Sequence, residues 1–85
     1  MKLQALIYVT LKGSVLDPQG AAVTKALHAM QYETVHDVRV GKYLEVIFEA
    51  QTKEQAHDLV KSMCDQFLTN PVIEKYTYEL VEVQS

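Results

Sequence analysis

The stretch Thr34–Ala50, TVHDVRVGKYLEVIFEA, decides the fold, because Gly41-Lys42 within it admits two interpretations. A tight hairpin turn there would pair Val40 with Tyr43 and would mix charged and apolar side chains on both faces. One continuous strand instead separates the two kinds of side chain. Its apolar face would carry Val38, Val40, Leu44, Val46, Phe48 and Ala50. We therefore predict a long strand, bent near Gly41, whose overhang pairs with another chain.

Two further strands and two helices surround this stretch. Lys2–Lys12 alternates apolar and polar residues, as in a half-buried strand, and Ile73–Val83 alternates in the same way. A helix is predicted from Asp17-Pro18 to about residue 31, and a second one begins at the capping-box pair Thr52 and Gln55. Asn70-Pro71 ends the second helix.

The predicted fold is a single α+β domain over residues 1–85. It consists of an antiparallel sheet with two helices on one face and one long, bent central strand. Two helices cover only one face, so the other is left bare. That face would show Leu6, Tyr8, Tyr43 and Ile47, and we predict that it forms a buried interface between copies of the chain.

Composition excludes several classes of function. Eight Lys and Arg against eleven Asp and Glu give a net charge of −3, with no basic cluster that could neutralise several phosphates. Nucleic acid is therefore a poor candidate partner. No apolar run is long enough to cross a membrane, and we expect a cytoplasmic protein. The single cysteine, Cys64, falls on an apolar helical stripe and is predicted to be a buried thiol.

No enzyme motif appears in the sequence. Lys12-Gly13 lacks the residues of a phosphate-binding loop, and the three histidines lack the spacing of metal ligands. Glu45 and Glu49 would share a face of a strand about 13 Å apart, which is too far for an acid–base pair. We expect neither a catalytic residue nor a metal site on this chain.

Two motifs could contact a partner. The helix start at Asp17, Pro18, Gln19 and Gly20 offers oriented backbone amides, either for ordinary capping or for a docking group. Arg39, Gly41 and Lys42 meet at the bend of the long strand, where the two cations are either solvated or used in docking.

Three motifs in order, in a chain of this size, resemble the PurS family over essentially the whole length. They are Leu16-Asp17-Pro18-Gln19-Gly20, Val38-Arg39-Val40-Gly41-Lys42 and Asn70-Pro71-Val72-Ile73-Glu74. The resemblance implies a ferredoxin-related α+β layer and a dimeric, non-catalytic small subunit of phosphoribosylformylglycinamidine synthase, a glutamine-dependent C–N ligase of purine biosynthesis. The implied partners are a glutaminase subunit, which releases ammonia, and a synthetase subunit, which holds ATP and magnesium.

The resemblance also implies which residues contact those partners, without assigning each residue to one partner. They are Asp17, Pro18, Gln19 and Gly20, then Arg39, Gly41 and Lys42, then Asn70, Pro71 and Glu74. Gln31 departs from a glycine that is frequent in the family, and we expect it to cost about 1 kcal/mol if it adopts a left-handed helix end.

Two other functions compete with this interpretation. A regulatory module resembling an ACT domain would bind a small molecule at a dimer interface. An RNA-binding domain would read bases with aromatic side chains, and Gly41-Lys42-Tyr43 is superficially similar to the signature of such domains. However, Leu44-Glu45 departs from that signature, and the acidic net charge opposes RNA binding.

Overall fold

A computed structural model describes residues 1–83 of the chain. The elements follow in the order β1 (Lys2–Leu11), α1 (Pro18–Ala29), β2 (Lys42–Glu49), α2 (Lys53–Met63), the π-helical turn η1 (Cys64–Leu68) and β3 (Glu74–Glu82). The strands form an antiparallel sheet of order β2-β1-β3. The predicted α+β class with an antiparallel sheet and two helices is confirmed.

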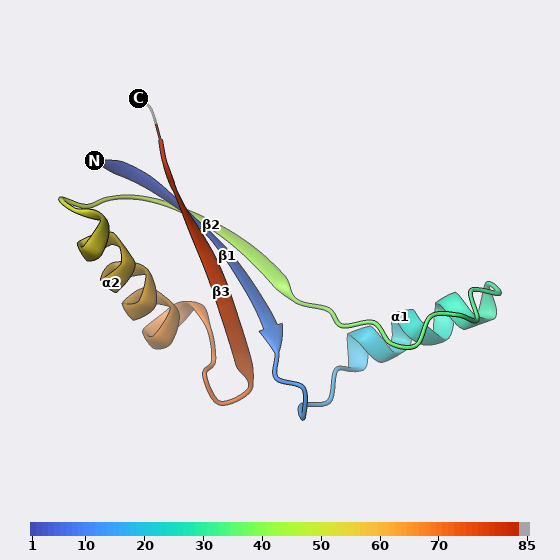
Figure 1. Cartoon of the computed structure of the whole chain (residues 1–85). Helices are drawn as coiled ribbons and strands as arrows, with labels where there is room; N and C mark the ends of the chain where they lie inside the picture. Colours follow the sequence, from blue (N-terminus) through green and yellow to red (C-terminus); the bar gives the residue numbers. More distant parts are fainter. Residues whose placement is uncertain (84–85) are drawn as a thin grey trace.

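The sheet has a packed inner face and a bare outer face. Residues alternate along each strand, so that Leu3, Ala5, Ile7 and Val9 of β1 point inward and are at most 1% exposed. α2 lies across this inner face (Figure 1), and the buried Val60 of α2 and Cys64 of η1 pack against the centre of β1. The predicted burial of the Cys64 thiol is confirmed.

Local sequence signals start and stop α2 as expected. The Thr52 hydroxyl oxygen accepts from the Gln55 backbone N–H at 3.1 Å, while the Gln55 side chain accepts from the N–H of Gln51. At the other end the chain tightens into η1, and the Thr69 N–H and hydroxyl both donate to the carbonyl of Cys64. Asn70-Pro71 then turns the chain into β3.

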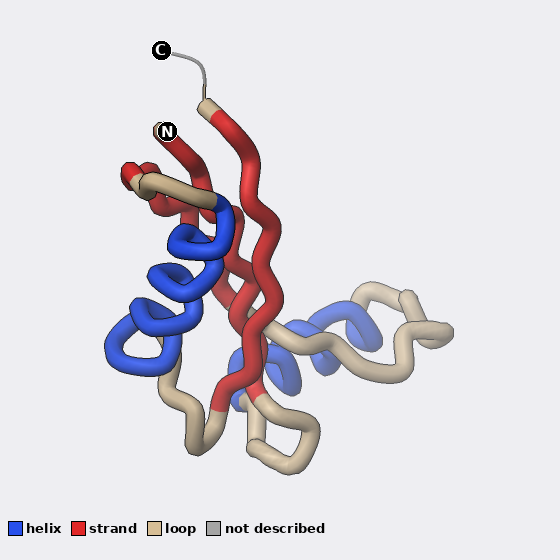
Figure 2. The backbone as a smooth tube through the Cα atoms, turned by 60° about the vertical axis from the view of Figure 1, so that its left-hand side comes forward, coloured by secondary structure: helices blue, strands red, loops and turns tan. Residues whose placement is uncertain are grey.

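The position of α1 differs from the prediction that two helices cover one face of the sheet. Figures 1 and 2 show α1 extending away from the sheet and lying beside the loop that follows it. Only α2 covers the inner face. Val23 of α1 and Met30, which follows the end of α1, are 41% and 65% exposed. Apolar residues at helical spacing predict that one face of a helix is buried, but they do not predict which element buries it.

The long strand also differs from its prediction. Residues 36–41 are extended but pair with no strand of the sheet, and the paired part covers only Lys42–Glu49. β2 is an edge strand, and the central strand is β1. The hairpin alternative is wrong, since the residues between α1 and Gly41 form no strand that pairs with Lys42–Glu49.

The end of α1 is closed by a strained residue. Gln31 has φ 74°, the left-handed conformation expected for it, and its N–H donates to the carbonyl of His28. A non-glycine residue held there costs about 1 kcal/mol.

Candidate functional site

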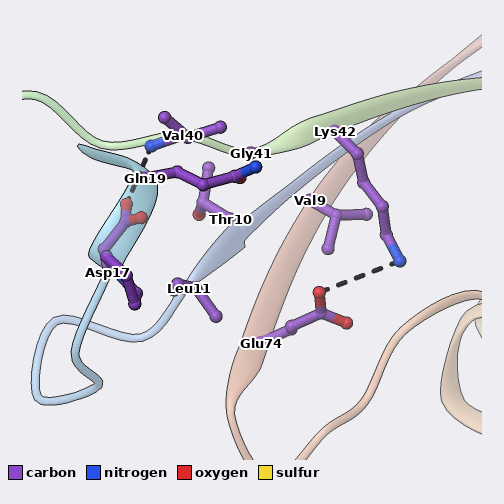
Figure 3. A pocket seen from close by; sticks show the side chains of 10 residues that line it. Val9, Thr10, Leu11, Asp17, Gln19, Val40, Gly41, Lys42 and Glu74 are labelled. Atoms are coloured by element: carbon purple, nitrogen blue, oxygen red, sulfur yellow. Dashed lines mark hydrogen bonds and ion pairs between the residues drawn. The ribbon is translucent and has the colours of Figure 1, made fainter. Parts of the chain in front are cut away.

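The three sequence motifs meet around one open pocket of about 370 Å³. The pocket lies where β1 ends and where α1, β2 and β3 begin, so four segments that are distant in sequence converge on it (Figure 3). Its lining consists of Val9, Thr10, Leu11, Asp17, Pro18, Gln19, Val40, Gly41, Lys42 and Glu74.

Asp17 joins α1 to the extended segment before β2. Its Oδ1 accepts from the Gly20 N–H at 2.9 Å, which caps the helix, and its Oδ2 accepts from the Val40 N–H at 2.8 Å. Pro18 occupies the first helical turn, where its missing N–H costs nothing. The hydrogen bonds from Gly20 and Val40 lower the pKa of Asp17, and the Arg39 guanidinium adds to the effect. The charged Asp17 side chain therefore fastens α1 to the segment before β2, and we call this carboxylate with its two backbone donors the Asp17 latch.

Two glycines permit the close approach that this latch requires. A Cβ on Gly20 would overlap the carbonyl oxygen of Val38, and a Cβ on Gly41 would overlap that of Val9. Both obstacles are backbone atoms, which cannot rotate away as the end of a side chain would. The glycines of the first two motifs are thus required by packing between segments, and neither has a positive φ.

Arg39 holds the loop between β1 and α1. Its Nη2 lies 3.0 Å from the carbonyl oxygen of Lys12 and 3.4 Å from those of Leu11 and Val15. Its Nε is 3.9 Å from Asp17. This cation is therefore engaged within its own chain, in addition to any docking contact.

Lys42 and Glu74 close the other side of the pocket. The Lys42 Nζ lies 3.8 Å from Glu74 Oε2, and Glu74 Oε1 accepts from the Asn70 N–H at 2.7 Å. The Asn70 side chain in turn accepts from the N–H of Val72. The third motif is thus a folded turn that presents Glu74 to Lys42 (Figure 3).

The structure places the ten predicted contact residues in three groups. Six of them line the pocket: Asp17, Pro18, Gln19, Gly41, Lys42 and Glu74. Gly20 and Arg39 support the latch, and Asn70 and Pro71 form the turn before Glu74. The lining residues of β1, Val9 to Leu11, were missed. The strand register would have found them, since Leu11 pairs with Glu74 and Val9 with Lys42.

The ionisable groups of this pocket are paired rather than poised for chemistry. Asp17 is held by backbone donors, and Lys42 neutralises Glu74. Within residues 1–83, no group of three or more His, Cys, Asp or Glu side chains could hold a metal ion. None of the helices in this range has the length and apolarity to span a membrane. The pocket is therefore a shaped surface whose charges are already paired within the chain.

The outer face of the sheet carries the predicted oligomer contacts. Tyr8, Tyr43 and Ile47 are 42%, 49% and 58% exposed, and the two tyrosine rings lie 5.1 Å apart. Leu6 sits between Glu45 and Glu79 in the register. Desolvation by its neighbours, with Glu45 next in importance, raises the pKa of Tyr43. The four predicted residues therefore share one face, which no helix within residues 1–83 covers.

Comparison with known proteins identifies the family. The sequence profile of PurS, described as "Phosphoribosylformylglycinamidine (FGAM) synthase", matches residues 4–82. The chain belongs to the PurS family. The PurS subunit of this synthase from Bacillus subtilis is 54% identical over 77 residues, which cover 91% of this chain and 90% of the relative. The Synechocystis subunit is 46% identical and spans 92% of this chain and 78% of the relative.

Solved structures agree with this assignment. The Bacillus subtilis PurS structure superposes with a TM-score of 0.83 at 50% identity and covers 94% of this chain and 99% of that one. A Thermotoga maritima structure named PurLQS superposes with a TM-score of 0.86 at 31% identity and covers 95% of this chain and 99% of that one. The resemblance of the three motifs to PurS is confirmed, and so is the association with phosphoribosylformylglycinamidine synthase of purine biosynthesis.

Proposed function

We propose that this PurS-family chain is the small subunit that bridges the glutaminase and synthetase subunits of phosphoribosylformylglycinamidine synthase. Family membership over residues 4–82 carries the proposal, and the similarity to a chain of the Thermotoga maritima PurLQS structure supports it. Ammonia released by the glutaminase would be protonated and diluted in bulk water. Holding the two active sites in register preserves its effective concentration.

The reacting groups belong to the partners in this proposal. The synthetase holds ATP and magnesium and activates the amide oxygen of formylglycinamide ribonucleotide, which ammonia displaces to form the amidine. This chain binds no cofactor and contributes surfaces. The complex works in the cytoplasm, where its nucleotide substrates are.

The pocket and its surrounding motifs form the proposed partner contact. Its polar lining is pre-organised, because the Asp17 latch and the Lys42–Glu74 pair fix the groups that face outward. Gln19 is the exposed polar side chain at the rim, and Pro18 adds a rigid apolar one. The contact set comprises Asp17, Pro18, Gln19, Gly20, Arg39, Gly41, Lys42, Asn70, Pro71 and Glu74.

Reconstitution with the glutaminase and synthetase from the same source tests the proposal. Leaving out this chain is expected to abolish the glutamine-dependent reaction and to affect the reaction with added ammonia much less, because only the former needs ammonia transfer between subunits. Both rates are measured as amidine formation under saturating ATP. Equal loss of the two rates would indicate that the chain contributes directly to the synthetase reaction. If neither rate fell, the bridging role would be rejected.

We also propose that the outer sheet face mediates association between copies of the chain, through Leu6, Tyr8, Tyr43 and Ile47. Tyr8 lies on the central strand β1, and its ring is tilted by 32° against that of Tyr43. Tyr8→Ser is expected to weaken self-association by about 30-fold, because truncating a central interface tyrosine costs about 2 kcal/mol. Sedimentation equilibrium measures the dissociation constant.

The matched control for this variant is Val72→Ser. Val72 is 77% exposed in the turn before β3 and lies outside the outer face, so its truncation is expected to leave self-association unchanged. Equal dissociation constants for Tyr8→Ser and the unchanged chain would exclude this face as an interface.

A further inference from the structure

Two apolar residues of the sequence motifs take no part in the Asp17 latch or the candidate pocket. Leu16 begins the first motif and is 80% exposed, and Val72 lies in the middle of the third motif and is 77% exposed. Neither side chain lines the candidate pocket. A single exposed apolar residue is common on protein surfaces, so the placement of these two decides whether they matter.

Both residues lie in loops at the same end of the sheet (Figures 1 and 2). Leu16 belongs to the loop between β1 and α1, and Val72 belongs to the turn between η1 and β3. The Lys12 N–H donates to the carbonyl of Ile73 at 2.8 Å and joins the two loops. Ile73 is itself 37% exposed. This end of the sheet therefore presents apolar side chains from two connected loops.

Hydrogen bonds hold the first loop in one shape although it is exposed. The Val15 N–H donates to the Lys12 carbonyl at 2.9 Å and closes a turn. The Arg39 guanidinium donates to the same carbonyl at 3.0 Å and to two neighbouring carbonyls at 3.4 Å. Directly after Leu16, the latch fixes Asp17. The backbone on both sides of Leu16 is therefore held from within the chain.

The second loop is held in the same way, around Asn70. The N–H groups of Ile73 and Glu74 donate to the Asn70 carbonyl at 3.1 and 2.7 Å, and the Asn70 side chain accepts from the Val72 N–H at 3.1 Å. Pro71 restricts the backbone further. A loop that already has its bound shape pays little conformational entropy on binding. Both apolar side chains are thus presented by pre-organised backbone, which suits them to anchor an interface.

The charges beside these loops indicate the chemistry of a partner. Lys12 and Lys75 are exposed, and neither forms an ion pair within residues 1–83. Asp37 lines a pocket with Lys75 and Arg39 and offsets part of this positive charge. The two carboxylates of the candidate pocket are already held by the latch and by an ion pair. Lysines without a counter-ion beside an apolar surface favour a partner with carboxylates at the rim of the contact.

We infer that this end of the sheet, with Leu16 and Val72 as its apolar anchors, docks into an apolar recess bordered by carboxylates on one enzyme subunit of the synthase. The inference rests on the proposed bridging function and extends the proposed contact beyond the pocket. Because the charged groups of the pocket are paired within the chain, they hold the two loops in place. The apolar side chains supply the area that becomes buried on docking.

Serine substitutions of the two anchors test the inference. Leu16→Ser and Val72→Ser are each expected to weaken binding to one enzyme subunit by about 10-fold, and the double variant by about 100-fold, because separate anchors contribute additively. Surface plasmon resonance measures the dissociation constant for the glutaminase and for the synthetase separately. Met30→Ser is the matched control, since Met30 is 65% exposed but follows the far end of α1 (Figure 1). It should leave both constants unchanged.

Charge reversal tests the carboxylate border of the recess. A variant with Lys12→Glu and Lys75→Glu is expected to associate about 10-fold more slowly with the same subunit at low salt, and the difference should shrink as salt is raised. Lys25→Glu, a single charge reversal at an exposed position of α1, is the control and should associate at the rate of the unchanged chain. No slowing of the double variant relative to this control would overturn the carboxylate border.

Stability and self-association are measured on the same variants. Because Leu16 and Val72 are exposed, their substitution should move neither the urea midpoint nor the self-association constant, so a loss of binding reports the docking surface. An unweakened double serine variant, with the unchanged chain still supporting the glutamine-dependent reaction, would overturn this inference and leave the bridging function standing. Equal weakening toward both subunits would also overturn it, because a single recess is proposed. If the unchanged chain bound neither subunit, both proposals would fall.

Discussion

Gly20→Ala is expected to lower the free energy of unfolding by about 3 kcal/mol, at the upper end of the range for overpacking. The added methyl group would overlap the carbonyl oxygen of Val38 and would lie 2.8 Å from the Asp17 carboxylate. Relief requires α1 to move away from residues 38–40, which breaks the hydrogen bond between Asp17 and the Val40 N–H. A domain of this length is stable by about 4–13 kcal/mol in total, so the loss is a large fraction.

Gly13→Ala is the matched control. Nothing lies within 4 Å of a Cβ at Gly13, and no glycine of the described chain has a positive φ. This variant should be neutral or up to about 1 kcal/mol more stable, because alanine restricts the unfolded chain. Urea unfolding followed by circular dichroism measures both variants. Equal stability of the two would contradict the packing of α1 against the extended segment.

Alternation along the chain was enough to predict the strands and their faces. It correctly placed Leu3, Ile7 and Val9 inward and Tyr8 outward, and it excluded a hairpin at Gly41. Strand order did not follow, because alternation says which side chains share a face and not which strands are neighbours. The expectation of a central long strand was wrong for that reason.

The position of α1 was beyond the reach of the pattern. Ala22, Val23 and Met30 recur at helical spacing, which indicates a face that seeks burial. In the structure this face stays exposed, because Asp17 and Gly20 fasten α1 to residues 38–40 at the end of the sheet. A helical stripe has the same appearance whether its cover comes from the same chain or from a second copy. The sequence therefore predicted the two helices and misplaced one of them.

The sequence motifs predicted most of the residues at the candidate pocket but not the contacts between them. Asp17 was recognised as a helix cap, and its second role as an acceptor for the Val40 N–H became visible only in three dimensions. Lys42 and Glu74 were named separately, and they meet because each lies opposite β1, at Val9 and Leu11. Motifs alone do not give the antiparallel register, and it is the register that brings these distant residues together.

Asp17→Asn is expected to destabilise the chain strongly at neutral pH and much less in acid. The Asp17 carboxylate accepts two backbone N–H groups, whereas an asparagine side chain has one acceptor oxygen and would turn an NH₂ group toward a donor. Those hydrogen bonds lower the pKa of Asp17 below its ordinary value of 3.8. A lowered pKa in the folded state contributes stability above the unfolded pKa, and this stability is lost as pH falls through the folded value.

The stability gap between the unchanged chain and Asp17→Asn should therefore be widest at pH 7 and should narrow as pH falls below about 4, the ordinary range of a carboxyl group. Urea midpoints at pH 7 and pH 3 measure it, and Asp58→Asn serves as the control. Asp58 is an exposed carboxylate on α2 with no hydrogen bond or ion pair within residues 1–83, so its gap should be near zero at both pH values. A gap for Asp17→Asn that does not change with pH would show that the negative charge is unimportant. The latch would then act by shape alone, and acid would leave α1 fastened to residues 38–40.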